Sequence, residues 1–201
     1  PDSAYIFAYA TIENNNHNGL HFAWSLDKSE WHPIGPEYSY VKSDYGSWGS
    51  QKRMITPFLF QSNDGMWHSV WSLNETDGAL AHSSSPDLIE WGRQSYPLLM
   101  QNGNIISPVI TFNNIDNDYT ISWLSKTEIG ENAYALNTKD FKDYGEATPV
   151  TKLKDARQEV LIANRYQRGT VHKVNWETVE NLIQNQQLNA YKGILLSETT
   201  S

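Results

Sequence analysis

Cysteine is absent from the 201 residues of this chain. The absence excludes disulfide scaffolds, thiolate metal sites and cysteine nucleophiles. Long apolar runs are missing as well: the mean hydropathy is −0.59, and no stretch approaches the length of a membrane span. We therefore expect neither a disulfide-stabilised scaffold nor a membrane partner.

Positive charge is scarce. Lys and Arg number 15 against 23 Asp and Glu, the net charge is −8, and the basic residues form no run. A nucleic-acid partner or an anionic membrane would require a basic patch, so neutral ligands suit this surface best. The chain starts at Pro1 without a methionine, which we interpret as removal of a signal segment and hence as a periplasmic or secreted location.

Aromatic residues, by contrast, are abundant, with 8 Trp and 11 Tyr. At this density aromatic rings either pack structural elements together or stack on the apolar faces of sugar rings. For any single Trp, core packing is the commoner role.

A sheet unit runs from Met54 to Trp91 and recurs on both sides. Its three short runs are rich in β-branched and aromatic residues and are separated by Asp-Gly turns, as in a meandering antiparallel sheet. Each copy closes on a Ser/Thr-x-Asp-x-x-x-aromatic signature. The three signatures are Ser25, Asp27 and Trp31; Ser85, Asp87 and Trp91; and Thr138, Asp140 and Tyr144.

The repeat has a period of roughly 50 to 60 residues with about four short strands per copy, which is typical of β-propeller blades. The sequence predicts an all-β, β-propeller-like fold of about three blades, each an antiparallel four-stranded sheet. Chance alternation in an ordinary β-sandwich is the alternative. We assign the blades to residues 1–153, and closing strands, a short C-terminal helix and a tail to residues 154–201.

The first blade has no inner strand of its own, because only Pro1 to Ala4 precede its first strand. Propellers commonly close by pairing strands from the two ends of the chain, since an open sheet edge invites aggregation. Residues 159–163 and 169–174 are the predicted tail strands. The helix that follows should end in the polar run 184–187 and leave residues 195–201 as a frayed terminus or linker.

Three motifs in the second unit carry a family resemblance. They are the Met-x-x-Pro strand at Met54 and Pro57, Asp64-Gly65-x-Trp67-His68-x-Val70-Trp71, and Ala81-x-Ser83-Ser84-x-x-Asp87-Leu88-Ile89-x-Trp91. The unit resembles a blade of the family 43 glycoside hydrolases, and the likeness extends over roughly residues 5–145. These enzymes are five-bladed propellers that cleave arabinose- and xylose-containing polysaccharides. The resemblance implies a carbohydrate-active module that is incomplete relative to five blades.

The carboxylates that this family uses for catalysis are replaced. Its members carry Arg-Asp-Pro on the inner strand of the second blade and a Glu beside a Pro on that of the third. Here these places read Ile55-Thr56-Pro57 and Ser107-Pro108-Val109. The usual glycoside hydrolysis needs two carboxyl groups, one protonated and one ionised. The resemblance therefore implies a catalytically degenerate module that binds arabinose- or xylose-containing polysaccharide or supports a neighbouring catalytic domain.

Two alternatives stay open. One is an active glycosidase, of the α-L-arabinofuranosidase or β-xylosidase type, that uses substitute carboxylates. Its candidates are Asp2, Asp44 and Glu159, the last because it lies on an apolar run where burial favours a protonated acid. The other is a structural fragment of a larger protein or a homo-oligomer, because three blades bury too little surface to close a ring.

Seven residues are predicted, from their strand or loop positions, to contact the sugar. They are Trp48, Arg53, Thr56, His68, Trp71, Ser107 and Trp123. His68 and His82 lie on neighbouring strands, but no third ligand stands at matching spacing, so we interpret them as hydrogen-bonded structural residues. We expect no metal site and no organic cofactor.

Overall fold

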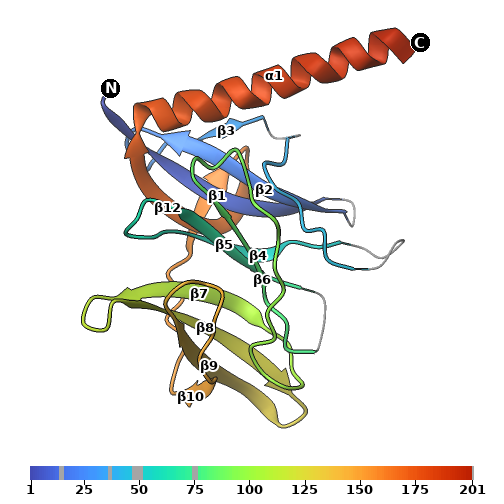
Figure 1. Ribbon diagram of the computed structural model, residues 1–201. Helices are drawn as coiled ribbons and strands as arrows, with labels where there is room; N and C mark the ends of the chain where they lie inside the picture. The colour runs from blue at the N-terminus through green and yellow to red at the C-terminus, as the bar shows by residue number, and fades with distance from the viewer. Residues whose placement is uncertain (14–15, 36–37, 47–51, 74–76, 201) are drawn as a thin grey trace.

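The computed structural model describes residues 1–13, 16–35, 38–46, 52–73 and 77–200. These residues form three antiparallel sheets and one helix. In Figure 1 the sheets lie one below another, and the helix crosses above the first. Each sheet is centred on the stretch of chain that the repeat assigned to one blade, so the prediction of an all-β, propeller-like fold of about three blades is confirmed.

The first sheet combines strands from both ends of the chain. Its strands are β1 (Ser3–Glu13), β2 (Asn16–Ser25), β3 (His32–Ile34), β11 (Gln158–Ile162) and β12 (Arg165–Asn175), in the spatial order β11-β12-β1-β2-β3. Strand β12 runs antiparallel to β1, with Ser3 opposite Asn175 and Ala8 opposite Thr170. Thus β12 supplies the strand that the first blade lacks, as the sequence led us to expect.

The second and third sheets are meanders of consecutive strands. The second contains β4 (Ile55–Gln61), β5 (Trp67–Ser72) and β6 (Ala81–Ser85), and the third contains β7 (Ile106–Asn113), β8 (Asp118–Thr127), β9 (Gly130–Thr138) and β10 (Thr148–Val150). The three sheets therefore have five, three and four strands rather than four each. The sequence did not predict β10. All three of its residues are exposed, so the strand lacks the alternation of apolar and polar residues by which a strand is recognised.

The repeated Ser/Thr-x-Asp signature forms a turn at the ends of β2, β6 and β9. In the second copy, Oγ of Ser85 accepts a 2.9 Å hydrogen bond from the backbone N–H of Leu88. Oδ1 of Asp87 accepts from the N–H groups of Ile89 and Glu90, at 2.9 and 2.8 Å. The other two copies repeat these bonds. The signature therefore recurs because its side chains satisfy the backbone donors of a tight turn.

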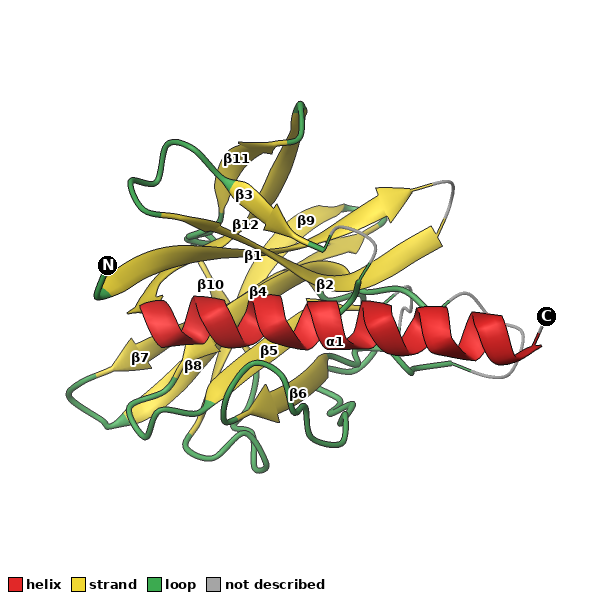
Figure 2. Cartoon of the chain, turned by 90° about the horizontal axis from the view of Figure 1, so that it is seen from above, coloured by secondary structure: helices red, strands yellow, loops and turns green. Residues whose placement is uncertain are grey.

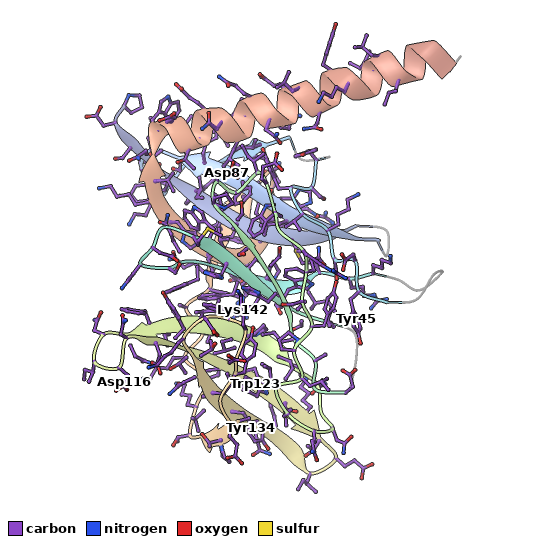
Figure 3. The ribbon with its side chains drawn as sticks, viewed as in Figure 1. Tyr45, Asp87, Asp116, Trp123, Tyr134 and Lys142 are labelled. Atoms are coloured by element: carbon purple, nitrogen blue, oxygen red, sulfur yellow. The ribbon has the colours of Figure 1, made fainter. Side chains whose placement is uncertain are left out.

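Equivalent tryptophans on β5 and β8, Trp71 and Trp123, lie in the hydrophobic core. Both side chains are fully buried. Nε1 of Trp71 donates to Oγ of Ser43 at 3.2 Å. Trp123 stacks on Tyr134 of β9, with the ring centroids 6.2 Å apart (Figure 3). The aromatic residue at this place in the repeat is a core residue.

Helix α1 spans Trp176–Thr200 and is longer than the sequence analysis predicted. Its first turns are anchored, because Val179 and Leu182 are fully buried. The last turns extend past the sheets (Figure 2). The predicted short helix, ending at 184–187 before a frayed tail, is therefore wrong: Gln favours a helix interior, and no proline interrupts the run. No helix in the described ranges combines the length and apolarity needed to cross a bilayer.

Candidate functional site

The inner strands of the second and third sheets bulge at matching places. The pairing of β4 with β5, and of β7 with β8, shifts register there. Thr56 and Ser107, each followed by a proline, have φ angles of 46° and 50°. This left-handed conformation is costly for a residue with a Cβ, and a β-branched Thr adopts it rarely. Such backbone persists only where its surroundings hold it, and it concentrates at functional sites.

Arg157 lies between the two bulges and holds them. Its Nη2 donates to the carbonyl oxygens of Thr56 and Pro108, both at 2.6 Å, and its Nη1 donates to that of Ser107 at 3.4 Å. The side chain is 1% exposed, and the guanidinium lies 5.2 Å from the centroid of the Phe58 ring. Burial lowers the pKa of Arg157, yet a guanidinium stays protonated in proteins. A cation therefore occupies the space between β4 and β7.

Asp155 balances this buried cation. Its Oδ1 accepts from Nη1 of Arg157 at 3.1 Å and from the backbone N–H of the same residue at 3.0 Å. Its Oδ2 accepts from Nη2 of Arg168 at 2.8 Å. A general acid must present a protonated carboxyl to the glycosidic oxygen. Both oxygens of Asp155 are instead occupied by guanidinium donors.

A cleft of about 380 Å³ opens beside this cluster, and we call it the inner-strand cleft. It is lined by Ser107, Leu124, Glu131, Ala133, Thr151, Lys152, Leu153, Asp155 and Arg168. Hydroxyl, ammonium, guanidinium and carboxylate groups thus meet over a few apolar side chains. Such a lining can donate hydrogen bonds to a hydroxyl-rich ligand and accept them from it.

Two of the predicted sugar contacts, Thr56 and Ser107, are brought together by Arg157. Oγ1 of Thr56 lies 3.3 Å from Oγ of Ser72, and Ser107 lines the inner-strand cleft. Arg53 is half-buried just before β4, and its contact with a sugar stays a prediction. The predicted contact at Trp48 lies outside the described residues.

The other predicted contacts lie elsewhere. Trp71 and Trp123 are fully buried in the core, so neither ring has a face open to a sugar. Nδ1 of His68 lies 3.0 Å from Nε2 of His82, and the His68 ring stacks on Phe141 with the centroids 4.1 Å apart. Desolvation lowers the pKa of both histidines, to about 3 for His82. Both rings stack on Phe141, which follows β9 of the third sheet, and they line a separate cleft of about 390 Å³ rather than the inner-strand cleft.

The substitute carboxylates Asp2, Asp44 and Glu159 are scattered over the surface. All three are exposed. Asp2 is held by its backbone, since its carbonyl oxygen accepts from the N–H of Trp176 at 3.1 Å. Glu159 lies on β11 opposite Arg168, and the burial on which its acid role depended is missing.

Sequence reasoning missed Arg157, Asp155, Arg168 and Glu131. The first three lie in the tail, after the third repeat has ended, so no period marks them. Glu131 lies at the start of β9, at the exposed end of the polar β8–β9 hairpin, where charged residues are ordinary. The sequence offers one signal for this cluster: a pair of opposite charges, Asp155 and Arg157, stands directly before the apolar strand β11.

The chain matches no family model, and no curated protein matches its sequence. It does match solved structures. An N-acetylgalactosamine deacetylase from F. plautii, in complex with blood group B trisaccharide, aligns with a TM-score of 0.51 and 12% identity, covering 73% of this chain and 49% of that one. A glycosyl hydrolase from Bacteroides ovatus aligns with a TM-score of 0.44 and 17% identity, covering 75% and 46%.

At 12% identity, the likeness to the deacetylase concerns the fold alone. The chain spans about half the length of the structures it matches, 49% of the deacetylase and 46% of the hydrolase. The resemblance to family 43 therefore stays a prediction from the sequence motifs.

Proposed function

We propose that this chain is a carbohydrate-binding propeller module that does not hydrolyse its ligand. One observation carries the proposal. Where the family 43 resemblance calls for carboxylates, the inner strands carry Thr56 and Ser107, and the guanidinium of Arg157 is bonded to both strands. The solved protein with the matching fold acts on a carbohydrate, and we extend that ligand class to this chain as part of the proposal.

The absence of hydrolysis follows from the chemistry of the inner strands. Glycoside cleavage needs one carboxyl group to protonate the leaving oxygen and a second to attack or to activate water. The hydroxyls of Thr56 and Ser107 can bind a sugar but cannot supply a tuned acid at neutral pH. Loss of general acid–base help costs about two to four powers of ten in rate.

The ligand that we propose is an arabinose- or xylose-containing polysaccharide, following the sequence motifs. The inner-strand cleft offers Thr151, Lys152 and Arg168 as hydrogen-bond donors to sugar hydroxyls. In this role the module would hold polysaccharide for a neighbouring catalytic domain. A periplasmic or secreted location, where such substrates occur, belongs to the same proposal.

One observation favours a second candidate, an active glycosidase. Glu131 and Asp155 both line the inner-strand cleft, so two carboxylates do face one space. Against this role, Glu131 lies 3.8 Å from Nζ of Lys126, and both oxygens of Asp155 already bind guanidinium groups. We therefore rank hydrolysis second.

The experiment that separates the two functions is an overnight incubation with the chromogenic glycosides 4-nitrophenyl α-L-arabinofuranoside and 4-nitrophenyl β-D-xylopyranoside. We expect no release of 4-nitrophenol above that of buffer. Release that disappears in both Glu131→Gln and Asp155→Asn, while Asp116→Asn stays active, would establish the glycosidase and end the binding-only account. Asp116 is a suitable control because it is exposed in the turn between β7 and β8.

A further inference from the structure

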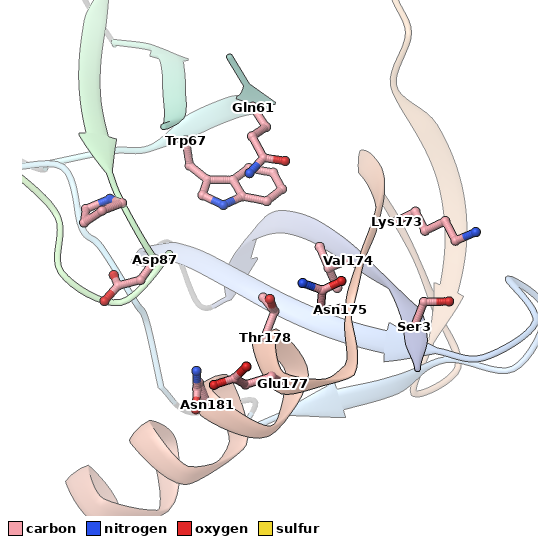
Figure 4. A pocket seen from close by; sticks show the side chains of 11 residues that line it. Ser3, Gln61, Trp67, Asp87, Lys173, Val174, Asn175, Glu177, Thr178 and Asn181 are labelled. Carbon is pink, nitrogen blue, oxygen red and sulfur yellow. The ribbon is translucent and has the colours of Figure 1, made fainter. Parts of the chain in front are cut away.

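A second and larger cleft lies at the seam between the first and second sheets. Its volume is about 570 Å³, within the range of ligand sites in proteins. We call it the seam cleft (Figure 4). It is lined by Ser3, Gln61, Trp67, Pro86, Asp87, Lys173, Val174, Asn175, Glu177, Thr178 and Asn181. These residues come from β1, β4, β5, β12, the turn after β6 and the start of α1, so the cleft exists only because the tail closes onto the first blade.

Trp67 presents an unused donor to the seam cleft. The residue is 5% exposed, and its ring meets His172 edge to face with the centroids 5.2 Å apart. Among the residues that the structure describes, its indole N–H has no hydrogen-bond partner. Figure 4 places the indole across the cleft from Asn175 and Thr178, with its nitrogen on the edge that faces them. Although most of the residue is buried, this nitrogen is not among the fully buried polar atoms that lack a partner, so it is open to the cleft and can donate to a ligand acceptor.

Neutral polar groups face Trp67 from the start of α1. Asn175 precedes the helix, and Thr178 and Asn181 follow in its first two turns. Within the described part of the chain none of these three side chains has a hydrogen-bond partner. Amide and hydroxyl groups both donate and accept, which matches the paired donor and acceptor character of sugar hydroxyls.

The charge of the seam cleft selects against anions. Asp87 and Glu177 line it with a single cation, Lys173. Glu177 also sits in the first turn of α1, where it offsets the partial positive charge of the helix N-terminus. A uronic acid or phosphate would therefore meet net negative charge, whereas a neutral sugar would not.

We propose that the seam cleft is a second carbohydrate subsite, which takes a neutral sugar unit of the polysaccharide through the Trp67 indole, Asn175, Thr178 and Asn181. The inference rests on the proposed function, because it places a ligand of the same class. It goes further by adding a subsite away from the inner strands, where the family resemblance would not place one. Loss of the inner-strand carboxylates then leaves binding intact.

The test is isothermal titration of the full chain with xylotriose and with linear arabinotriose. Thr178→Val and Asn181→Ala each remove one polar contact from the helix surface, and we expect each to weaken binding about three- to tenfold. Trp67→Phe removes the indole N–H while keeping an aromatic ring. Asn189→Ala is the matched control, since it changes the same residue type on an exposed part of α1 about two turns further on. It should bind like the unchanged chain.

A second readout follows Trp67 directly. In a ¹H–¹⁵N spectrum, the indole signal that is lost in Trp67→Phe identifies the residue among the 8 tryptophans. We expect that signal to move on addition of the bound neutral trisaccharide and to stay fixed with trigalacturonate, an anionic trisaccharide.

The outcomes distinguish this inference from the proposed function. Weaker binding in Thr178→Val and Asn181→Ala, with a moving Trp67 signal, supports both. Binding that these variants leave unchanged and that Lys152→Ala abolishes would overturn the seam cleft but keep a carbohydrate-binding module in the inner-strand cleft. Absence of binding by the unchanged chain would overturn both.

Discussion

The guanidinium of Arg157 donates a 2.6 Å hydrogen bond to the carbonyl oxygen of Thr56, across 101 residues of sequence. The same group reaches Pro108 in the third sheet, while β12 pairs with β1 in the first. The tail therefore supplies the inner strand of the first sheet and contacts the inner strands of the other two. The guanidinium thus lies between the bulges of β4 and β7, and its place there is the structural basis of our proposal that the chain binds a sugar without hydrolysing it.

Replacement of Arg157 by Met should lower the free energy of unfolding by about 3–5 kcal/mol. The change leaves buried carbonyl oxygens and the Asp155 carboxylate without the guanidinium donors that they now bind. Arg168→Met removes the other partner of Asp155, but that side chain is 57% exposed, and we expect a loss below about 1 kcal/mol. Urea denaturation followed by tryptophan fluorescence measures both. Equal losses would show that Arg157 is an ordinary surface cation in solution.

Loss of the turn hydroxyl in Ser85→Ala should cost about 1–2 kcal/mol, because Ser85 is fully buried and accepts from the N–H of Leu88 at 2.9 Å. Ser84→Ala is the matched control: Ser84 is half-buried on the same strand and bonds no described residue through its hydroxyl. Thermal unfolding of the two variants compares them. If Ser84→Ala were as unstable as Ser85→Ala, the turn hydrogen bond could not be the reason why the Ser/Thr-x-Asp signature recurs.

Acid should destabilise the protein well above the range in which aspartates titrate. Burial holds the pKa of His68, His82 and His172 below the ordinary value of 6.5, at about 3 for His82 and about 4 for His172. The unfolded chain therefore takes up protons near pH 6.5 while the folded chain does not. Stability that is fully present above pH 6.5 is lost as the pH falls toward 4, by about 1.4 kcal/mol per pH unit for each of His82 and His172, and His68 acts in the same direction.

The measurement is the free energy of unfolding between pH 7.0 and 4.5. Hydrogen bonds in the turns also lower the pKa of Asp27, Asp87 and Asp140, but from 3.8, so they act below this window. His82→Gln should reduce the slope of the free energy of unfolding against pH by the contribution of one histidine. A flat profile in the unchanged chain would contradict the burial of these rings.

Deletion of residues 188–201 should leave the fold nearly as stable as before. Leu188, Tyr191 and Ile194 are 57–60% exposed, so the end of α1 contributes little packing, and we expect a change below about 0.5 kcal/mol. Leu182→Ala should cost about 2–5 kcal/mol, because that side chain is fully buried under Tyr40. Circular dichroism and urea denaturation report both. A large loss on deletion would mean that the overhanging turns are packed in solution.

The sequence predicted those parts of the fold that repeat or pair by pattern. The Ser85-x-Asp87 turn recurs because its backbone N–H groups need the same side-chain acceptors in each blade. The regular spacing of the motif in the sequence therefore allowed the turn to be predicted. Closure of the first blade followed from its missing strand. The end of α1 was not predictable in this way, because the polar run 184–187 is equally typical of a helix end and of an exposed helix face.

The candidate site was predicted less well than the fold. Thr56 and Ser107 were predicted because each stands beside a proline at the place where the family resemblance expects a carboxylate; the bulges there were not predicted. Trp71 and Trp123 were assigned to a ligand although they pack the core, since alternation on a strand does not distinguish the two faces of a blade. Arg157 is a single charged residue whose partners are backbone carbonyls distant in sequence, and such contacts leave no local signal.

The central claim is that this propeller binds a neutral sugar without cleaving it, and one titration tests it most directly. Xylotriose and linear arabinotriose are titrated calorimetrically into the full chain, and the contents of the cell are kept overnight and analysed for mono- and disaccharides. The account predicts saturable binding of at least one trisaccharide, with the sugar recovered intact. Release of arabinose or xylose that is lost in Glu131→Gln and Asp155→Asn would contradict it.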